Sequence, residues 1–202
     1  MEAQMQTDPR FSQNHYMLRK KALKLFGGSF TFYDPSGQVA FYADMKAFKL
    51  KEDIRIYSDT NKQLELLAIK ARNIIDWASG TYDVFDSATN TLIGSFKRRG
   101  LASAFVRDEW VLLDTAGIEY GLIQEDSIVM GMLRRWIPFM ALIPQSYSVF
   151  VNNIEVADFK QQFNPFILKI DLDFSKDQTS RFDRRLGIAA ALLMSAIEGK
   201  QE

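Results

Sequence analysis

Cysteine is absent from this chain, and histidine occurs once, as His15. The missing thiols exclude disulfide bonds, thiol catalysis and thiolate metal sites, and they are compatible with a reducing compartment. A single imidazole leaves little material for a histidine metal site or a Ser-His-Asp triad. We therefore expect no metal and no cofactor, and we expect His15 to be packed or solvated at the start of a strand.

An excess of either charge is also missing, because 25 basic residues balance 25 acidic ones. This balance argues against the broad basic face of a nucleic-acid-binding protein, although it allows a local basic patch. Residues 1–14 are polar and lack the apolar segment of a secretory signal. We expect a flexible arm over residues 1–14 and a soluble, cytoplasmic protein that could associate peripherally with a membrane.

No apolar run reaches the length of a membrane span, and the longest one near the C-terminus is Leu186–Ile197. Twelve helical residues extend roughly 18 Å, whereas the hydrocarbon core of a bilayer is roughly 30 Å thick. The run has no polar stripe, so a helix here must be surrounded on every side. Charged residues flank it at Arg185 and Glu198. The pattern predicts a helix over residues 183–198 that is buried inside protein.

The rest of the chain reads as hairpins. Phe30–Asp34 is rich in aromatic residues and runs into the turn Asp34-Pro35-Ser36-Gly37. Similar units flank Asp114–Gly117 and Asn152-Asn153, and residues 166–173 alternate as in a half-buried strand. Ten or more antiparallel strands followed by one apolar helix predict a closed β-barrel with the helix in its lumen. This mainly β (α+β) unit would be a single domain over residues 15–199.

Several stretches resemble the LURP-one-related proteins of the tubby-like superfamily, with phospholipid scramblases as more distant relatives. The stretches that carry the resemblance are Phe32–Gly37, Tyr82–Asp86, Gly94–Arg98 and the closing segment Phe182–Gly199. The resemblance implies a barrel of twelve strands around a central hydrophobic helix. Lipid binding follows from it only as an analogy at the level of the family.

Two basic segments are candidate binding sites. Lys97, Arg98 and Arg99 follow a predicted strand and open a loop, where three adjacent cations could hold a phosphate or an acidic lipid headgroup. A solvated charge run at the rim of the barrel is the alternative. Arg134 and Arg135 lie within the apolar stretch 128–143, which could plug a barrel end or contact a membrane interface.

Asp171, Asp173 and Asp177 suggest a calcium loop, but that motif requires glycine and glutamate where this chain has Lys176 and Phe182. On a strand, Asp171 and Asp173 would instead share a solvent-facing side. No paired carboxylates of an acid–base catalyst can be identified, so we expect a protein that is not an enzyme.

Two functions from different classes remain. The first is a non-catalytic module that binds anionic phospholipid headgroups, or another anionic ligand, through Lys97, Arg98, Arg99, Arg134 and Arg135. The second is a protein-interaction scaffold with no lipid or small-molecule ligand. The oligomeric state is left open.

Overall fold

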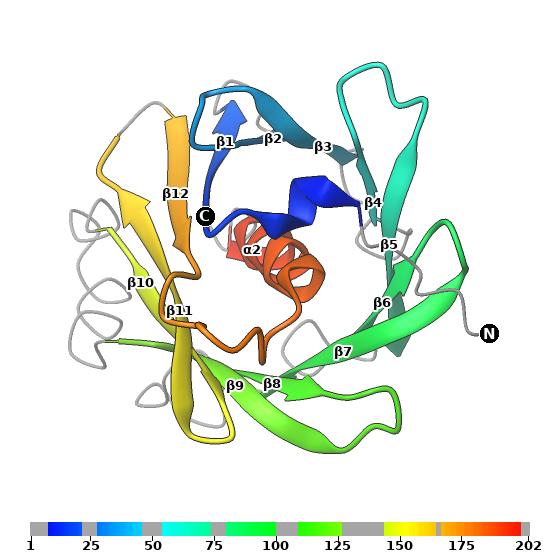
Figure 1. The fold of residues 1–202 in the computed structure, drawn as a ribbon, viewed down its shortest axis with the longest axis vertical. Helices are drawn as coiled ribbons and strands as arrows, with labels where there is room; N and C mark the ends of the chain where they lie inside the picture. Colours follow the sequence, from blue (N-terminus) through cyan, green and yellow to red (C-terminus); the bar gives the residue numbers. More distant parts are fainter. Residues whose placement is uncertain are drawn as a thin grey trace.

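A computed structural model describes residues 8–21, 28–45, 54–73, 80–99, 109–126, 144–164 and 167–198. In these ranges twelve strands form a closed antiparallel barrel (Figure 1). The strands are β1 (His15–Lys21), β2 (Gly28–Tyr33), β3 (Val39–Met45), β4 (Ile54–Tyr57), β5 (Glu65–Asn73), β6 (Thr81–Asp86), β7 (Thr91–Arg99), β8 (Glu109–Leu113), β9 (Glu119–Glu125), β10 (Ser146–Val151), β11 (Ile154–Gln162) and β12 (Ile167–Asp173).

Each strand pairs with its neighbours in sequence, and β1 closes the ring by pairing with β12 as well as β2. The closed antiparallel barrel confirms the predicted fold class. Closure also removes the exposed sheet edges that an open twelve-stranded sheet would present.

The strands alternate between the interior and the outer surface of the barrel. In β2, Phe30 and Phe32 are 1% and 0% exposed, while Ser29 and Thr31 between them are half-buried. This is the period of two that a strand imposes when only one of its faces meets the core. In β2 the sequence therefore encodes which side chains line the lumen, whereas β8 and β11 each contain four consecutive buried residues and lack this alternation.

Short turns return the chain at the barrel end where the helix begins. Asp34 Oδ1 accepts hydrogen bonds from the amides of Ser36 and Gln38, and Gly37 has a φ of 79°. Asp114 makes the same contacts in the β8–β9 turn, where Gly117 has a φ of 81°. These dihedral angles lie in the region that glycine occupies without steric cost.

The helix α2 (Arg184–Glu198) lies in the middle of the ring of strands (Figure 1). Asp183 caps it by accepting the amide of Arg185, and every residue from Leu186 to Ala196 is buried. Ser195, the polar residue within this run, satisfies its hydroxyl by donating to the carbonyl of Ala191 at 2.7 Å. The prediction of an enclosed helix is confirmed.

Membrane insertion of this helix is a separate question from its burial. Within the described residues, no helix has the length and apolar character needed to cross a bilayer.

Two arginines fasten the start of α2 to the barrel. Arg184 contacts Asp177 at 2.8 Å, and Arg185 contacts both Asp183 at 2.6 Å and Asp86 at 2.9 Å. The carboxylate of Asp177 also accepts the amides of Arg181 and Phe182. These contacts position the helix along the lumen, because Asp86 belongs to β6 and Asp177 to the loop after β12.

The flexible arm expected over residues 1–14 needs a correction. Residues 9–12 form a short 3₁₀ helix, η1 (Pro9–Ser12), and Phe11 stacks on Phe41 with ring centroids 4.6 Å apart. The hydroxyl of Tyr16 donates to the carbonyl of Arg10 at 2.6 Å. One buried aromatic ring thus attaches a polar segment to the core, whereas residues 1–7 lie outside the described residues.

Substituting Gly187 tests how tightly the barrel encloses the helix. An added Cβ would overlap the ring of Phe174, which is fully buried. We expect Gly187→Ala to lower the free energy of unfolding by about 1–2 kcal/mol, because overpacking outweighs the gain in helix propensity. Urea denaturation measures this. In a Phe174→Leu background the same substitution should cost less, and equal costs in both backgrounds would contradict the steric explanation.

Replacing Asp177 tests the anchor at the start of the helix. Burial raises the pKa of Asp177, but the amides of Phe182 and Arg181 and the guanidinium of Arg184 outweigh burial and lower it below its usual value. The carboxylate therefore stabilises the fold at pH values above the unfolded-state pKa, and this contribution is lost as the pH falls through the folded-state pKa.

We expect Asp177→Asn to cost about 1–3 kcal/mol at neutral pH, since it weakens hydrogen bonds to a charged acceptor. The difference between wild type and variant should shrink on acidification below pH ~4. Denaturant melts at several pH values measure it. A difference independent of pH would show that the charge of Asp177 is not responsible.

Candidate functional site

Two cations face each other on the outer wall of the barrel. Arg19 of β1 lies directly opposite Lys169 of β12, at the seam where the first and last strands pair. Their neighbours Leu18 and Ile170 point inward and are 0% and 8% exposed. Because side chains alternate along a strand, Arg19 and Lys169 both point outward.

Neither cation of this pair has an acidic partner among the described residues, and Arg19 Nε is buried without a hydrogen-bond acceptor. Arg55, Arg72 and Arg99 on other strands each contact a carboxylate. Like charges directly opposite each other on antiparallel strands destabilise the pair. The arrangement therefore favours an anion from outside the chain.

A groove of about 320 Å³ lies beside the pair, across β1, β12 and β11. Met17 and Pro35 supply apolar lining, and Lys160 of β11 adds a further cation. Lys160 is exposed and lies opposite Asp171 of β12. The volume lies at the lower end of the range found for small-molecule sites.

Carboxylates line the rest of the groove. Asp171 accepts a hydrogen bond from Gln162 at 2.6 Å, and Asp173 accepts the amide of Ser175 at 2.8 Å. Burial raises the pKa of Asp173, but the hydrogen bonds from Ser175 and the charges of His15 and Lys176 lower it below its usual value.

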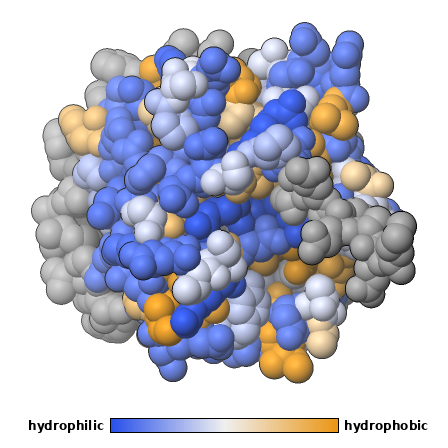
Figure 2. All heavy atoms as spheres, in the orientation of Figure 1, coloured by the Kyte–Doolittle hydropathy of each residue, from blue (hydrophilic) through white to orange (hydrophobic). Residues whose placement is uncertain are grey.

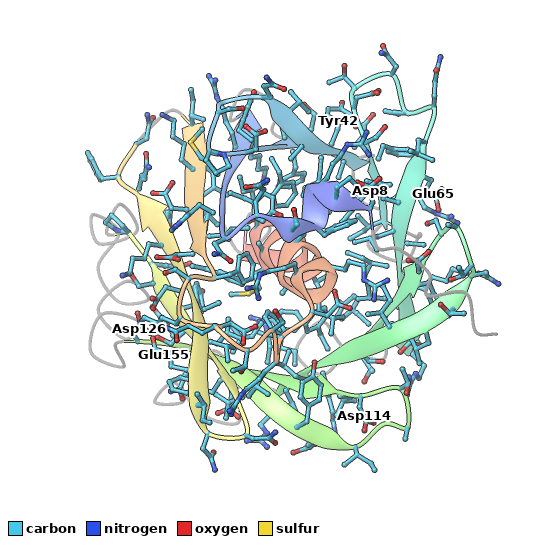
Figure 3. All side chains as sticks on the ribbon, in the orientation of Figure 1. Asp8, Tyr42, Glu65, Asp114, Asp126 and Glu155 are labelled. Atoms are coloured by element: carbon cyan, nitrogen blue, oxygen red, sulfur yellow. The ribbon has the colours of Figure 1, made fainter. Side chains whose placement is uncertain are left out.

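A further carboxylate of the groove, Asp158, is linked through Lys176 to an acidic residue outside it. Asp158, which lines it, contacts Lys176 at 2.6 Å, and the hydrogen bonds that Lys176 donates to Asp158 and Glu155 raise the pKa of the lysine. Glu155 and Asp126 are labelled in Figure 3. The hydroxyl of Ser148 contacts both of their carboxylates. Lys176 thus forms ion pairs with Asp158 and Glu155, and its charge also acts on Asp173 without a direct contact.

His15 lies in the groove, with Nδ1 3.5 Å from Asp173 Oδ1. Asp171 and Asp173 flank Leu172, which is 1% exposed, so both carboxylates are on the outward side as predicted. Asp177 belongs to the helix anchor and not to this groove. Within the described residues, no group of histidines and carboxylates is arranged to hold a metal ion.

The predicted basic loop at residues 97–99 is part of a strand. All three residues belong to β7, so they alternate in direction instead of converging on one ligand. Lys97 is exposed, and Arg98 is 3% exposed with its guanidinium 5.6 Å from the centroid of the Trp110 ring. Arg99 contacts Glu109 and Glu119. The expectation that these cations form one phosphate grip is therefore not supported by their geometry.

Arg134 and Arg135 lie outside the described residues, as does the whole stretch 128–143. Their predicted role stays a prediction. Arg19 and Lys169 were not identified from the sequence, because each is an ordinary cation on a strand until the β1–β12 register brings the two together.

The barrel opening seen in Figure 2 is mostly hydrophilic, with hydrophobic residues in small separate groups. The exposed large apolar residues in the described ranges include Val39, Leu64, Ile118, Ile154 and Phe163. Scattered apolar residues of this kind are normal on soluble surfaces. The candidate binding groups are therefore the charged residues of the outer wall and not these scattered apolar residues.

The fold and the site define a class of protein: a closed barrel whose lumen is filled by its own helix, with the candidate binding groups on the outside. The chain belongs to the LURP-one-related family, whose model matches residues 15–185. This match confirms the resemblance seen in the sequence. The chain has no match among curated proteins and none among solved structures.

Neutralising Lys169 tests whether the opposed cations repel each other. In a buffer of low ionic strength without multivalent anions, Lys169→Gln should raise the free energy of unfolding by about 0.2–1 kcal/mol. Chemical denaturation measures the change. Lys70→Gln is the matched control, because Lys70 lies opposite Asp83 and over the ring of Phe85, and it should lose stability. Loss of stability in both variants would contradict repulsion at the seam.

Proposed function

We propose that this protein is a non-catalytic binding module that holds anionic phospholipid headgroups on the outer wall of β1 and β12. The observation that carries the proposal is the opposed pair Arg19 and Lys169, which has no carboxylate partner among the described residues. Such a pair costs stability in the free protein, and an anion placed between the two side chains offsets that cost.

The chemistry of the pair suits a phosphate group. The planar guanidinium of Arg19 can donate two parallel hydrogen bonds to phosphate oxygens, and the ammonium of Lys169 adds a compact charge. Lys160 lines the adjoining groove and can reach the same ligand from β11. The patch is too small for the extended phosphate backbone of a nucleic acid, which agrees with a net charge of zero.

A non-catalytic role is supported by the filled lumen. The side chains of α2 from Leu186 to Ala196 are buried against the inward-facing residues of the strands. A substrate would therefore have to bind on the outside, where reactants are exposed to water. Attachment to anionic lipid would place the protein at the surface of a membrane, which is the peripheral location expected from the sequence.

A protein-interaction scaffold is the second candidate. It is supported by exposed aliphatic residues that follow the turns at the barrel end where the helix begins. They include Ile118, which is 64% exposed, and Ile154, which is 47% exposed. Such a scaffold would not discriminate between vesicles of different charge, so one experiment separates the two functions.

Vesicle sedimentation tests the lipid proposal. Wild-type protein should bind phosphatidylglycerol vesicles and not phosphatidylcholine vesicles. Arg19→Gln plus Lys169→Gln should weaken binding about thirtyfold, since each cation near an anionic surface contributes about 1 kcal/mol. Lys97→Gln plus Arg99→Gln is the control: it removes the same charge from β7 and should have a much smaller effect.

Three results would overturn the proposal. These are a wild-type protein that binds neither vesicle, a wild-type protein that binds both equally, and a control variant that loses as much affinity as the test variant. The last result would show that binding depends on total charge and not on the β1–β12 seam.

A further inference from the structure

We propose that the groove and the adjoining cation pair together recognise a zwitterionic headgroup, namely a phosphate ester that carries a primary ammonium group two carbons away, whose N–H donors the trimethylammonium of phosphatidylcholine lacks. This inference rests on the proposed function, since it uses the same cations for the phosphate. It adds the carboxylates of the groove, which the proposed function leaves without a role.

The cations and the carboxylates beside the groove lie in separate rows across β1 and β12. Arg19 and Lys169 form the cationic row, and Met17 and Asp171 form the next row toward the start of the helix. Asp173 lies one row further, opposite His15. Rows of the same face are separated by two residues, or about 7 Å along the strand. A ligand of headgroup size can therefore place its phosphate on one row and its ammonium on the next.

Among the described residues, Asp171 and Asp173 form no direct ion pair with a lysine or an arginine. Asp171 accepts a hydrogen bond from the neutral side-chain amide of Gln162. Asp173 accepts the backbone amide of Ser175 and lies 3.5 Å from Nδ1 of His15. Asp158, by contrast, is already paired with Lys176. An alkylammonium group can add an ion pair at Asp171 or Asp173 without displacing these hydrogen bonds.

The lining also fits the uncharged part of such a headgroup. Met17 and Pro35 offer apolar contacts for the two methylene groups between phosphate and nitrogen. The volume of about 320 Å³ accommodates the headgroup and leaves the groove open to solvent at the outer wall.

Asp171 and Asp173 also disfavour the binding of ligands that carry more negative charge. A ligand with several phosphates would place negative charge beside Asp171 and Asp173, which costs free energy through repulsion. A single phosphate without an ammonium would use the cationic row alone. The groove therefore selects by charge pattern and not by net charge.

His15 provides a direct probe of the groove, because it is the only histidine in the chain. Its ring C–H signals can be followed by NMR at constant pH during titration with glycerophosphoethanolamine or with glycerol 3-phosphate. We expect glycerophosphoethanolamine to bind roughly three- to fivefold more tightly, the effect of one exposed ion pair.

Two variants separate the contributions. Asp171→Asn plus Asp173→Asn should abolish the preference and still bind both phosphates, since asparagine keeps the hydrogen-bond acceptors. Arg19→Gln plus Lys169→Gln should lose both ligands. Equal wild-type affinity for the two phosphates, or a preference that survives in the asparagine variant, would overturn this inference and leave the proposed function standing.

The failure of the proposed function has a different signature, which is wild-type protein that binds neither phosphate. Adding vesicles of phosphatidylcholine with phosphatidylethanolamine identifies the source of the headgroup. Binding to these vesicles supports a lipid ligand, whereas binding of the soluble ester alone supports the same recognition of a free metabolite.

Discussion

The enclosure of one apolar helix is the constraint on which the rest of this structure depends. The segment from Leu186 to Ala196 has no face that water could solvate, and all of it is buried in the barrel. A curved but open sheet would leave part of it exposed, so β1 must pair with β12. Closure in turn leaves the lumen filled with the side chains of the helix and the strands, so the candidate site lies on the outer wall.

Charges in the protein divide according to this architecture. Arg184 and Arg185, at the start of the helix, contact Asp177, Asp183 and Asp86, and these pairs fix the helix in the barrel. On the outer wall, Arg19 and Lys169 have no carboxylate partner among the residues that the structure describes. Arg184 and Arg185 are thus paired with carboxylates, whereas the repulsion between Arg19 and Lys169 lowers the stability of the fold locally. Such departures from local consistency are expected where function requires them.

The sequence predicts features that depend on local patterns. The apolar run identifies α2, and Asp34 with Gly37 identifies the β2–β3 turn, because each signal lies within a few residues. It does not predict the site, since Arg19 and Lys169 are brought together only by the closure of the barrel. The prediction of a loop at residues 97–99 is wrong, because β7 continues to Arg99, beyond the apolar residues that mark a strand. Phe11 was missed because a single aromatic residue gives no periodic signal.

The position of the candidate site at the closing seam has an energetic consequence. Arg19 and Lys169 belong to the first and last strands, and only the folded barrel holds them opposite each other. An anion that bridges them therefore binds the native state and not the unfolded chain, so its binding free energy adds to the stability of the fold. The repulsion within the pair loosens the seam in the free protein, and the ligand removes that repulsion. Under the proposed function, binding of the anion and closure of the barrel would form one coupled equilibrium at the β1–β12 seam.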